Sequence, residues 1–236
     1  MIIFIASISI GSIEAVDILR KIDNNEVYTS IRYEADMIIT TQGKKYVKSL
    51  NGYSLGNKNF FAEFTNPDDA GTKYLKKDGN LYVYSPDAEE VIPITGHMLK
   101  ESMMGSDMSY EDTINNDTLE SQYNAKIVEE TQYEGKAVYV LELIGKTKIL
   151  SYPKQMMWID KSNFTVWKAE KFALSGTKLK EEKVLEYKKI GDRYFPVDIE
   201  VRDLLRKDSL TVFKYSKIEL DVKIPGNMFS LKNLER

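Results

Sequence analysis

The sequence predicts a mainly β (α+β) protein, in which a curved, mostly antiparallel sheet forms a half-open β-barrel and a few short helices pack into its mouth. The first observation is that apolar and polar residues alternate in about a dozen segments, the period of a strand with one buried face. The second is that short turn signals join these segments, which favours antiparallel neighbours. The third is that helical periodicity is confined to short stretches, so the long sheet has to curl to protect its edges.

The first element is a helix over Val16–Asn24, because its apolar residues recur three and four positions apart and Asp17 lies in its first turn. The period then changes to two between Val27 and Ile39. This alternation predicts a long strand with one apolar and one mostly polar face. Gln42-Gly43 is expected to turn the chain back.

The remaining strands share this alternation and end at turn residues. Asp78-Gly79 is the strongest hairpin signal, because both residue types tolerate the positive φ of a two-residue turn. The strands are expected at Lys45–Leu55, Phe60–Phe64, Thr72–Lys76, Leu81–Ser85, Glu90–Ile94, Ala125–Tyr133, Ala137–Ile144, Met156–Asp160, Val166–Leu174, Leu179–Ile190, Tyr194–Val201 and Leu210–Leu220. Residues 16–236 are predicted to form one domain around one core.

The two groups of strands are joined by a segment with a different pattern. Ser109 and Asp112 have the spacing of a helix N-cap and an acid in the first turn, which predicts a short helix over Ser109–Asn115. A second short helix is expected over His97–Met104. The segment also concentrates methionines: Met98, Met103, Met104 and Met108. They are either ordinary core residues or an adaptable surface for apolar partners of varying shape.

Residues 1–15 form a short apolar run that ends in small residues. A membrane-spanning helix needs roughly 20 apolar residues, so we expect a secretory signal peptide cut after Ala15. No Lys or Arg precedes the run, and a buried N-terminal strand is the alternative interpretation. The signal peptide predicts an exported, periplasmic protein. Because no cysteine follows the run, we do not expect the protein itself to be lipid-anchored.

Composition excludes several classes of function. The 236 residues include 33 basic and 36 acidic side chains, and a net charge of −3 offers no basic field for nucleic acid. The absence of cysteine and the single histidine exclude thiolate chemistry and multi-histidine metal sites. The basic runs are expected to lie on solvated faces: Lys44-Lys45, Lys76-Lys77 and Lys178–Lys183.

No pattern of catalytic residues is present. Adjacent carboxylates on a strand point to opposite faces, so Glu181-Glu182 and Glu89-Glu90 do not form two-carboxylate sites. Ser106 does not fit the Gly-x-Ser-x-Gly nucleophile elbow, because Met104 and Met108 stand where the motif needs glycine, and a hydrolase would have to use His97 as its only histidine base. We therefore expect a protein that is not an enzyme.

Two acids of the central segment are candidate cation ligands. Asp107 and Asp112 lack the length and the glycine of a calcium-binding loop, and helix capping explains both better. No metal and no cofactor is expected.

Several motifs occur in the order found in one known family. They are Asn66-Pro67-Asp68-Asp69-Ala70-Gly71-Thr72, Leu81-Tyr82-Val83-Tyr84-Ser85-Pro86, Met104-Gly105-Ser106-Asp107-Met108-Ser109-Tyr110-Glu111-Asp112, Arg193-Tyr194-Phe195-Pro196 and Ile224-Pro225-Gly226-Asn227-Met228-Phe229. In this order they resemble the outer-membrane lipoprotein-sorting protein family, which is related to the carriers LolA and LolB and to the sensor RseB. The chain departs from the family at Tyr82, where a Trp is common, and at Glu89-Glu90, where a basic pair is common.

The resemblance implies a half-open barrel in which the short helices form a lid over an apolar cavity, and a periplasmic carrier of lipids or lipoprotein acyl chains. The cargo would pass from an inner-membrane transporter toward an outer-membrane acceptor, and the carrier is expected to be a monomer. Rigid aromatic walls and mobile methionines suit acyl chains, whose binding strengthens by about 0.8 kcal/mol per buried methylene. The expected ligand-binding residues are Tyr33, Met37, Phe60, Phe64, Leu81, Val83, Met98, Met103, Met104, Met108, Phe195, Val197 and Ile199, and the family motif comprises Gly105, Ser106, Asp107, Ser109, Tyr110 and Asp112.

Three other interpretations remain open. Each wall residue would also be apolar if it served only the core of the sheet. A sensor or adaptor that binds a partner protein or a mislocalised lipoprotein is the alternative function. A lipid-modifying hydrolase dependent on His97 is a third hypothesis.

Overall fold

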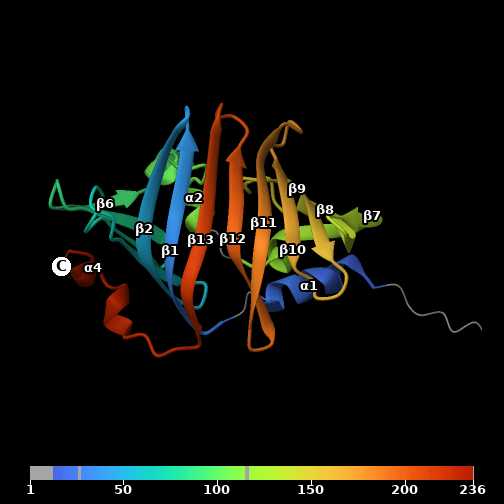
Figure 1. Cartoon of the computed structure of the whole chain (residues 1–236), viewed down its shortest axis with the longest axis horizontal. Helices are drawn as coiled ribbons and strands as arrows, with labels where there is room; N and C mark the ends of the chain where they lie inside the picture. The colour runs from blue at the N-terminus through green and yellow to red at the C-terminus, as the bar shows by residue number, and fades with distance from the viewer. Residues whose placement is uncertain (1–12, 26–27, 115–116, 236) are drawn as a thin grey trace, which may run out of the picture.

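The computed structural model describes residues 13–25, 28–114 and 117–235. Thirteen strands form one antiparallel sheet in the order β6-β5-β4-β3-β2-β1-β13-β12-β11-β10-β9-β8-β7 (Figure 1). The strands are β1 (Ser30–Thr41), β2 (Lys44–Leu55), β3 (Asn59–Phe64), β4 (Lys73–Lys77), β5 (Asn80–Ser85), β6 (Glu90–Ile94), β7 (Tyr123–Tyr133), β8 (Lys136–Gly145), β9 (Lys154–Asp160), β10 (Val166–Phe172), β11 (Lys178–Ile190), β12 (Arg193–Asp203) and β13 (Ser209–Leu220). The predicted curved, open, mostly antiparallel sheet with few helices is confirmed.

Strand β1 lies between β2 and β13, so the last strand of the chain lies at the centre of the sheet. Met37 of β1 is opposite Lys48 of β2 on one side and Phe213 of β13 on the other. The two edge strands are β6 and β7, and residues 95–122 connect them. The central segment of the sequence therefore links the two edges of the open sheet.

Two apolar clusters lie on one face of the sheet, which we call the inner face. The first includes Met37, Phe64 and Phe213 and extends over β1–β6, β12 and β13. The second lies between α1 (Ala15–Asn25) and strands β7–β10, where Ile18 and Leu19 of the helix are buried. Burial of one such aliphatic side chain contributes about 1.5–3 kcal/mol. The amphipathic helix predicted from its spacing is confirmed.

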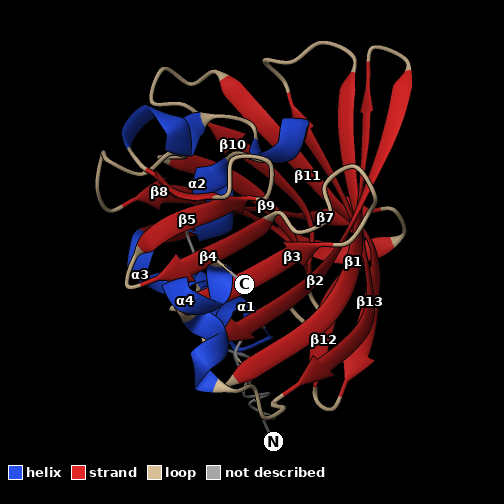
Figure 2. Ribbon diagram, turned by 90° about the vertical axis from the view of Figure 1, so that its left-hand side faces the viewer, coloured by secondary structure: helices blue, strands red, loops and turns tan. Residues whose placement is uncertain are grey.

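The C-terminal segment covers part of the opposite, outer face. It contains η3 (Gly226–Phe229) and α4 (Leu231–Leu234), and α4 lies over the outside of β3 and β4 (Figure 2). Phe229 and Leu234 are buried there against Phe61 and Leu75. Because Phe61 alternates with Phe60 and Ala62 of the inner face, β3 is buried on both sides.

The predicted single helix over His97–Met104 is wrong. The segment forms two 3-10 turns, η1 (Gly96–Lys100) and η2 (Met103–Gly105), separated by a bridge from Ser102 to Ser109. Met104 (φ 54°) and Gly105 (φ 78°) are left-handed, and this conformation ends a helix. The exposed His97 side chain lies in η1.

The predicted helix start at Ser109 is confirmed by α2 (Tyr110–Ile114). The Ser109 hydroxyl accepts a hydrogen bond from the Asp112 amide (3.3 Å), and the Ser109 amide donates to Asp112 Oδ2 (2.8 Å). This reciprocal pair is a capping box with aspartate in place of glutamate. A further short helix, α3 (Leu119–Gln122), precedes β7 and was not predicted.

Most of the predicted signal segment, residues 1–12, lies outside the described residues. Ile13 packs against the second apolar cluster and Ala15 begins α1. None of the helices formed by the described residues has the length and apolar character needed to cross a membrane.

Candidate functional site

The inner face encloses a small apolar cavity of about 230 Å³. Its wall is aromatic around Tyr215, whose ring centroid lies 5.1 Å from Tyr33 and 5.6 Å from Phe195. Burial raises the pKa of Tyr215 to about 12 and that of Tyr33 well above its ordinary value, so both rings stay neutral. This aromatic part of the wall is therefore rigid and uncharged.

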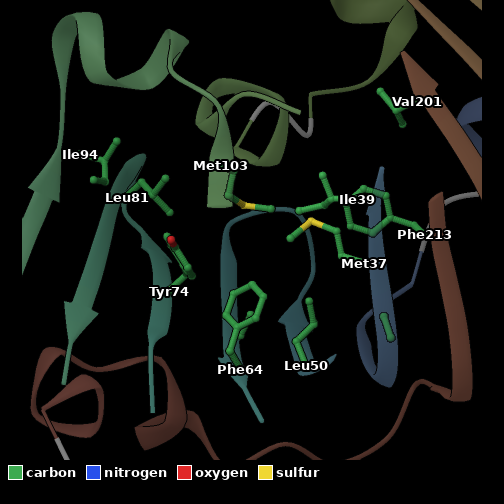
Figure 3. Packing of buried hydrophobic residues seen from close by; sticks show 12 residues of the cluster. Met37, Ile39, Leu50, Phe64, Tyr74, Leu81, Ile94, Met103, Val201 and Phe213 are labelled. Carbon is green, nitrogen blue, oxygen red and sulfur yellow. The ribbon is translucent and has the colours of Figure 1, made fainter. Parts of the chain in front are cut away.

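Residues 96–114, which we call the lid, cover this cavity. Met103 points from the lid toward Met37 and Ile39 of β1 (Figure 3). Met103 and Met108 line the cavity, and the Met104 sulfur accepts a hydrogen bond from the Tyr74 hydroxyl (3.1 Å). The predicted crowding of methionines in one region is thus present, and their side chains occupy space next to the aromatic wall.

The predicted ligand-binding residues converge on the first cluster and its cavity. Those lining the cavity are Tyr33, Phe60, Phe64, Met103, Met108 and Phe195. Those packed in the surrounding cluster are Met37, Leu81, Val83, Met98, Met104 and Ile199. Val197 is half-buried and lines neither of the cavities described here.

Sequence reasoning missed several residues of the wall. Tyr74, Phe213 and Tyr215 line the cavity but were not singled out. Their signal was present, because Phe213 and Tyr215 alternate on one face of β13. What the sequence lacked was the pairing of β13 with β1, which brings them beside Tyr33.

A larger cavity of about 590 Å³ adjoins the first, and Tyr28 and Asp112 line both. Its lining is mixed: Ile22, Met157 and Val166 are apolar, whereas most of the other lining residues are polar. The polar lining residues include Asp23, Asp112, Asp117, Gln122, Tyr123, Tyr152, Gln155 and Lys171. The interior therefore changes from apolar to polar along its length.

A buried polar network separates the two apolar clusters. Asp112, whose side chain is 6% exposed, accepts from Lys180 Nζ (2.5 Å) and from the Tyr152 hydroxyl (2.7 Å). Burial alone would raise the pKa of Asp112, but attraction to Lys171 and Lys180 together with the hydrogen bonds from Lys180 and Ser109 lowers it to about 2. Asp112 is therefore charged and joins the lid to β11.

Lys171 extends the same network. Its ammonium contacts Glu182 (2.5 Å) and lies 5.1 Å from the Tyr152 ring centroid. Burial lowers the pKa of Lys171, but the nearby carboxylates of Glu182 and Asp112 outweigh it and raise the pKa overall. The network thus pairs two ammonium groups with two carboxylates in the interior.

The expectation that the basic runs lie on solvated faces is wrong for two lysines. Lys180 is buried at Asp112, and Lys76 is buried with its Nζ donating to the backbone carbonyls of Asn57 (2.9 Å) and Ile114 (2.5 Å). Lys76 shares the inner face with Tyr74, two positions away. The alternation along β4 predicts that Lys76 lies on the inner face, whereas the charge of the run predicts a solvated position.

Asp107 is not a helix cap, contrary to expectation. It is 1% exposed and accepts hydrogen bonds from Thr211 Oγ1 (2.7 Å), Ser209 Oγ (2.8 Å) and the Asp203 amide (3.1 Å). The Asp107 amide donates in turn to Thr211 Oγ1 (2.8 Å). These contacts fasten the lid to the β12–β13 hairpin, because sequence-distant donors converge on one carboxylate.

Arg206, in the turn of the same hairpin, adds a second attachment. Its guanidinium donates to the carbonyls of Ser106 and Gly105 (2.9 Å for Gly105) and to Ser102 Oγ (3.2 Å). The Gly105-Ser106-Asp107 motif is therefore held by main-chain and side-chain contacts on both sides. Its role in this structure is attachment of the lid.

Comparison with solved structures identifies the class of fold. A DUF1329 family protein from Desulfovibrio piger has a TM-score of 0.85 and 25% identity, with 93% of this chain and 97% of that chain covered. A domain from Vibrio parahaemolyticus described as outer membrane lipoprotein-sorting has a TM-score of 0.83 and 20% identity, covering 94% and 98%. A LolA superfamily protein from Nitrosomonas europaea has a TM-score of 0.77 and 23% identity, covering 94% and 100%. The fold is LolA-like.

A comparison of the amino-acid sequence with family models assigns the chain to a family. A family model described as "Uncharacterized protein" matches residues 56–236, and the chain belongs to that family. The resemblance to outer-membrane lipoprotein-sorting proteins drawn from the ordered motifs is confirmed. A search among curated proteins found no match.

Proposed function

We propose that this protein is a periplasmic carrier that binds lipids, or the acyl chains of lipoproteins, in the space between the inner face and the lid. The observation on which the proposal rests is the pair of adjoining cavities beneath a lid of methionines, the first apolar and the second partly polar. An amphiphile needs both kinds of surface. Its acyl part would replace Met103 and Met108 against the aromatic wall, and its polar part would face Tyr152 and Lys171.

The structure corresponds to a closed form in this proposal. Ligand pockets commonly have volumes of about 300–1,000 Å³, and the apolar cavity is smaller, because lid side chains fill part of the space. Displacement of the lid would enlarge it. Because lid and ligand compete for the same apolar surface, the free energy of cargo transfer can remain small.

Binding rather than catalysis is proposed for the interior. The polar groups of the network are paired with one another: Lys180 with Asp112 and Lys171 with Glu182. Such pairing stabilises a wall, whereas a catalytic acid or base needs a free proton-transfer position. The apolar run at residues 1–15 and the resemblance support export to the periplasm, with an inner-membrane donor and an outer-membrane acceptor.

The test is native mass spectrometry of the protein purified from its periplasm without detergent, followed by organic extraction and by titration with a fluorescent fatty acid. We expect co-purified lipid or acylated protein, and we expect Ala35→Phe to abolish probe binding. Ala35 is buried in the wall of the apolar cavity, so a phenyl ring there fills the space without adding a charge. Ala137→Phe adds the same ring at an exposed position of β8 and is the matched control.

A second pair of variants tests the lid. Met103→Asp with Met104→Asp places charges against the aromatic wall, and bound lipid should be lost, whereas the Met→Leu pair keeps an apolar lid and should retain it. A protein that carries no lipid and whose wild-type cavity fails to bind the probe would refute the carrier proposal. That result would favour an adaptor that binds a partner protein.

A further inference from the structure

Three hairpin turns project from one end of the sheet. Strands β1, β10 and β12 run in the same direction, so the β1–β2, β10–β11 and β12–β13 turns lie together at that end. Figure 1 shows them along the top of the molecule, and Figure 2 shows them projecting upward together. We call this end the hairpin rim, comprising residues 42–47, 173–178 and 202–208.

The tips of the hairpin rim expose large apolar side chains. Leu174 is 72% exposed and Leu205 is 69% exposed, and Leu204 beside it is also exposed. The two hairpins are adjacent, because the Leu204 amide donates to the Leu179 carbonyl (2.8 Å). Isolated exposed leucines are common, but turn tips normally hold small polar residues, and clustered apolar side chains mark an interaction surface.

The charge of the hairpin rim is opposite to that of the whole chain. Lys44, Lys45, Arg202 and Lys207 are exposed there, and Asp208 is the only exposed carboxylate in these ranges. The chain as a whole has a net charge of −3. Apolar tips surrounded by cations match an anionic lipid surface, in which leucines enter the acyl boundary and lysines contact headgroups.

We propose that the hairpin rim docks on the surface of an anionic lipid bilayer. The β12–β13 hairpin that presents Leu205 also fastens the lid, through Arg206 and through the Ser209 and Thr211 contacts to Asp107. Docking therefore places the attachment of the lid next to the bilayer. The docking stands independently of the cavity, and only its use in cargo transfer rests on the proposed function.

The experiment is vesicle flotation of the full chain with phosphatidylcholine alone and with phosphatidylcholine containing phosphatidylglycerol. We expect binding to the anionic vesicles only, and an about tenfold or greater loss when Leu174→Ser and Leu205→Ser remove both apolar tips. Lys207→Gln should weaken binding about fivefold, and added salt should weaken it further. Leu231→Ser, at an exposed leucine of α4 away from the rim, is the matched control and should bind like the wild type.

Two results would overturn the inference. One is that the wild-type protein fails to float with anionic vesicles, which would leave a protein partner as the occupant of the rim. The other is that the double leucine variant floats as well as the wild type. The same variants should bind the fluorescent fatty acid normally, so failure of docking and failure of the carrier proposal are separable.

Discussion

Removal of the Asp107 carboxylate is the sharpest test of how the lid is held. Asp107→Ala deletes an acceptor of three hydrogen bonds, from Thr211, Ser209 and the Asp203 amide. Hydrogen bonds to charged groups contribute about 1.5–3 kcal/mol each, and each buried donor left without a partner costs about 1–3 kcal/mol. The hydroxyls can rotate toward other acceptors, so the sum is not reached, and we expect a net loss of about 3–4 kcal/mol.

Much of this loss should appear as local opening of the lid. Three backbone amides of the lid donate hydrogen bonds to carbonyls of the lid itself. They are Met103 to Met108, Ser106 to Met103 and Tyr110 to Glu101. Hydrogen exchange of these amides should accelerate about 100-fold in Asp107→Ala, because each 1.4 kcal/mol corresponds to a factor of ten. Asp107→Asn keeps one accepting oxygen, so its exchange rates should lie between those of Asp107→Ala and those of the wild type.

Tryptophan fluorescence separates lid opening from global unfolding. Trp158 and Trp167 lie in β9 and β10, away from the lid attachment, so their urea transition reports the sheet. In Asp107→Ala, we expect the free energy of opening reported by the lid amides to fall by more than the free energy of unfolding reported by the tryptophans. The reasoning would be refuted if the three amides exchanged at wild-type rates, or if they followed the tryptophan transition in every variant.

Three further predictions concern pH, backbone approach and the outer face. The pKa of Asp112 is lowered from 3.8 to about 2, and this shift contributes about 2 kcal/mol of stability above pH 4. That contribution should be lost as the pH falls from about 4 to about 2. Urea unfolding should show this pH dependence in the wild type and not in Asp112→Asn. Gly52→Ala places a Cβ 2.1 Å from the Tyr33 ring and should destabilise the protein by about 1–3 kcal/mol, whereas Gly226→Ala meets nothing within 4 Å and should be near neutral by the same thermal or urea measurement. Phe229→Ala should cost about 3–5 kcal/mol by urea denaturation, since its ring fills the outer cluster, and a near-neutral result would mean that the C-terminal segment does not support the sheet.

Local patterns predicted the elements well because each pattern has a direct physical cause. The two-residue period from Ile31 to Ile39 reports one buried strand face, and the spacing of Ile18, Leu19 and Ile22 reports one buried helix face. The Ser109–Asp112 cap was equally local. The His97–Met104 helix failed because apolar composition does not reveal the left-handed backbone at Met104.

Charge patterns predicted the wrong environment for residues whose burial depends on long-range pairing. Lys180 belongs to a run of charged residues, yet it is 7% exposed on its side chain because Asp112 of the lid neutralises it. Asp107 fits a capping motif in sequence but binds donors of β12 and β13 about 100 positions away. A buried charge depends on its partner, and the partner is specified by the fold.

The sequence by itself determined the mainly β class, the strand-by-strand alternation, the apolar identity of the wall and the placement of a methionine-rich segment between two groups of strands. Only the tertiary structure decided that β13 pairs with β1, that the C-terminal segment covers the outer face, and that the lid is fastened by Asp107, Asp112 and Arg206. Periodicity is a property of neighbouring residues, so it can be read from the linear sequence. Strand order and buried hydrogen-bond partners join residues far apart in the chain, so they exist only once the whole chain has folded.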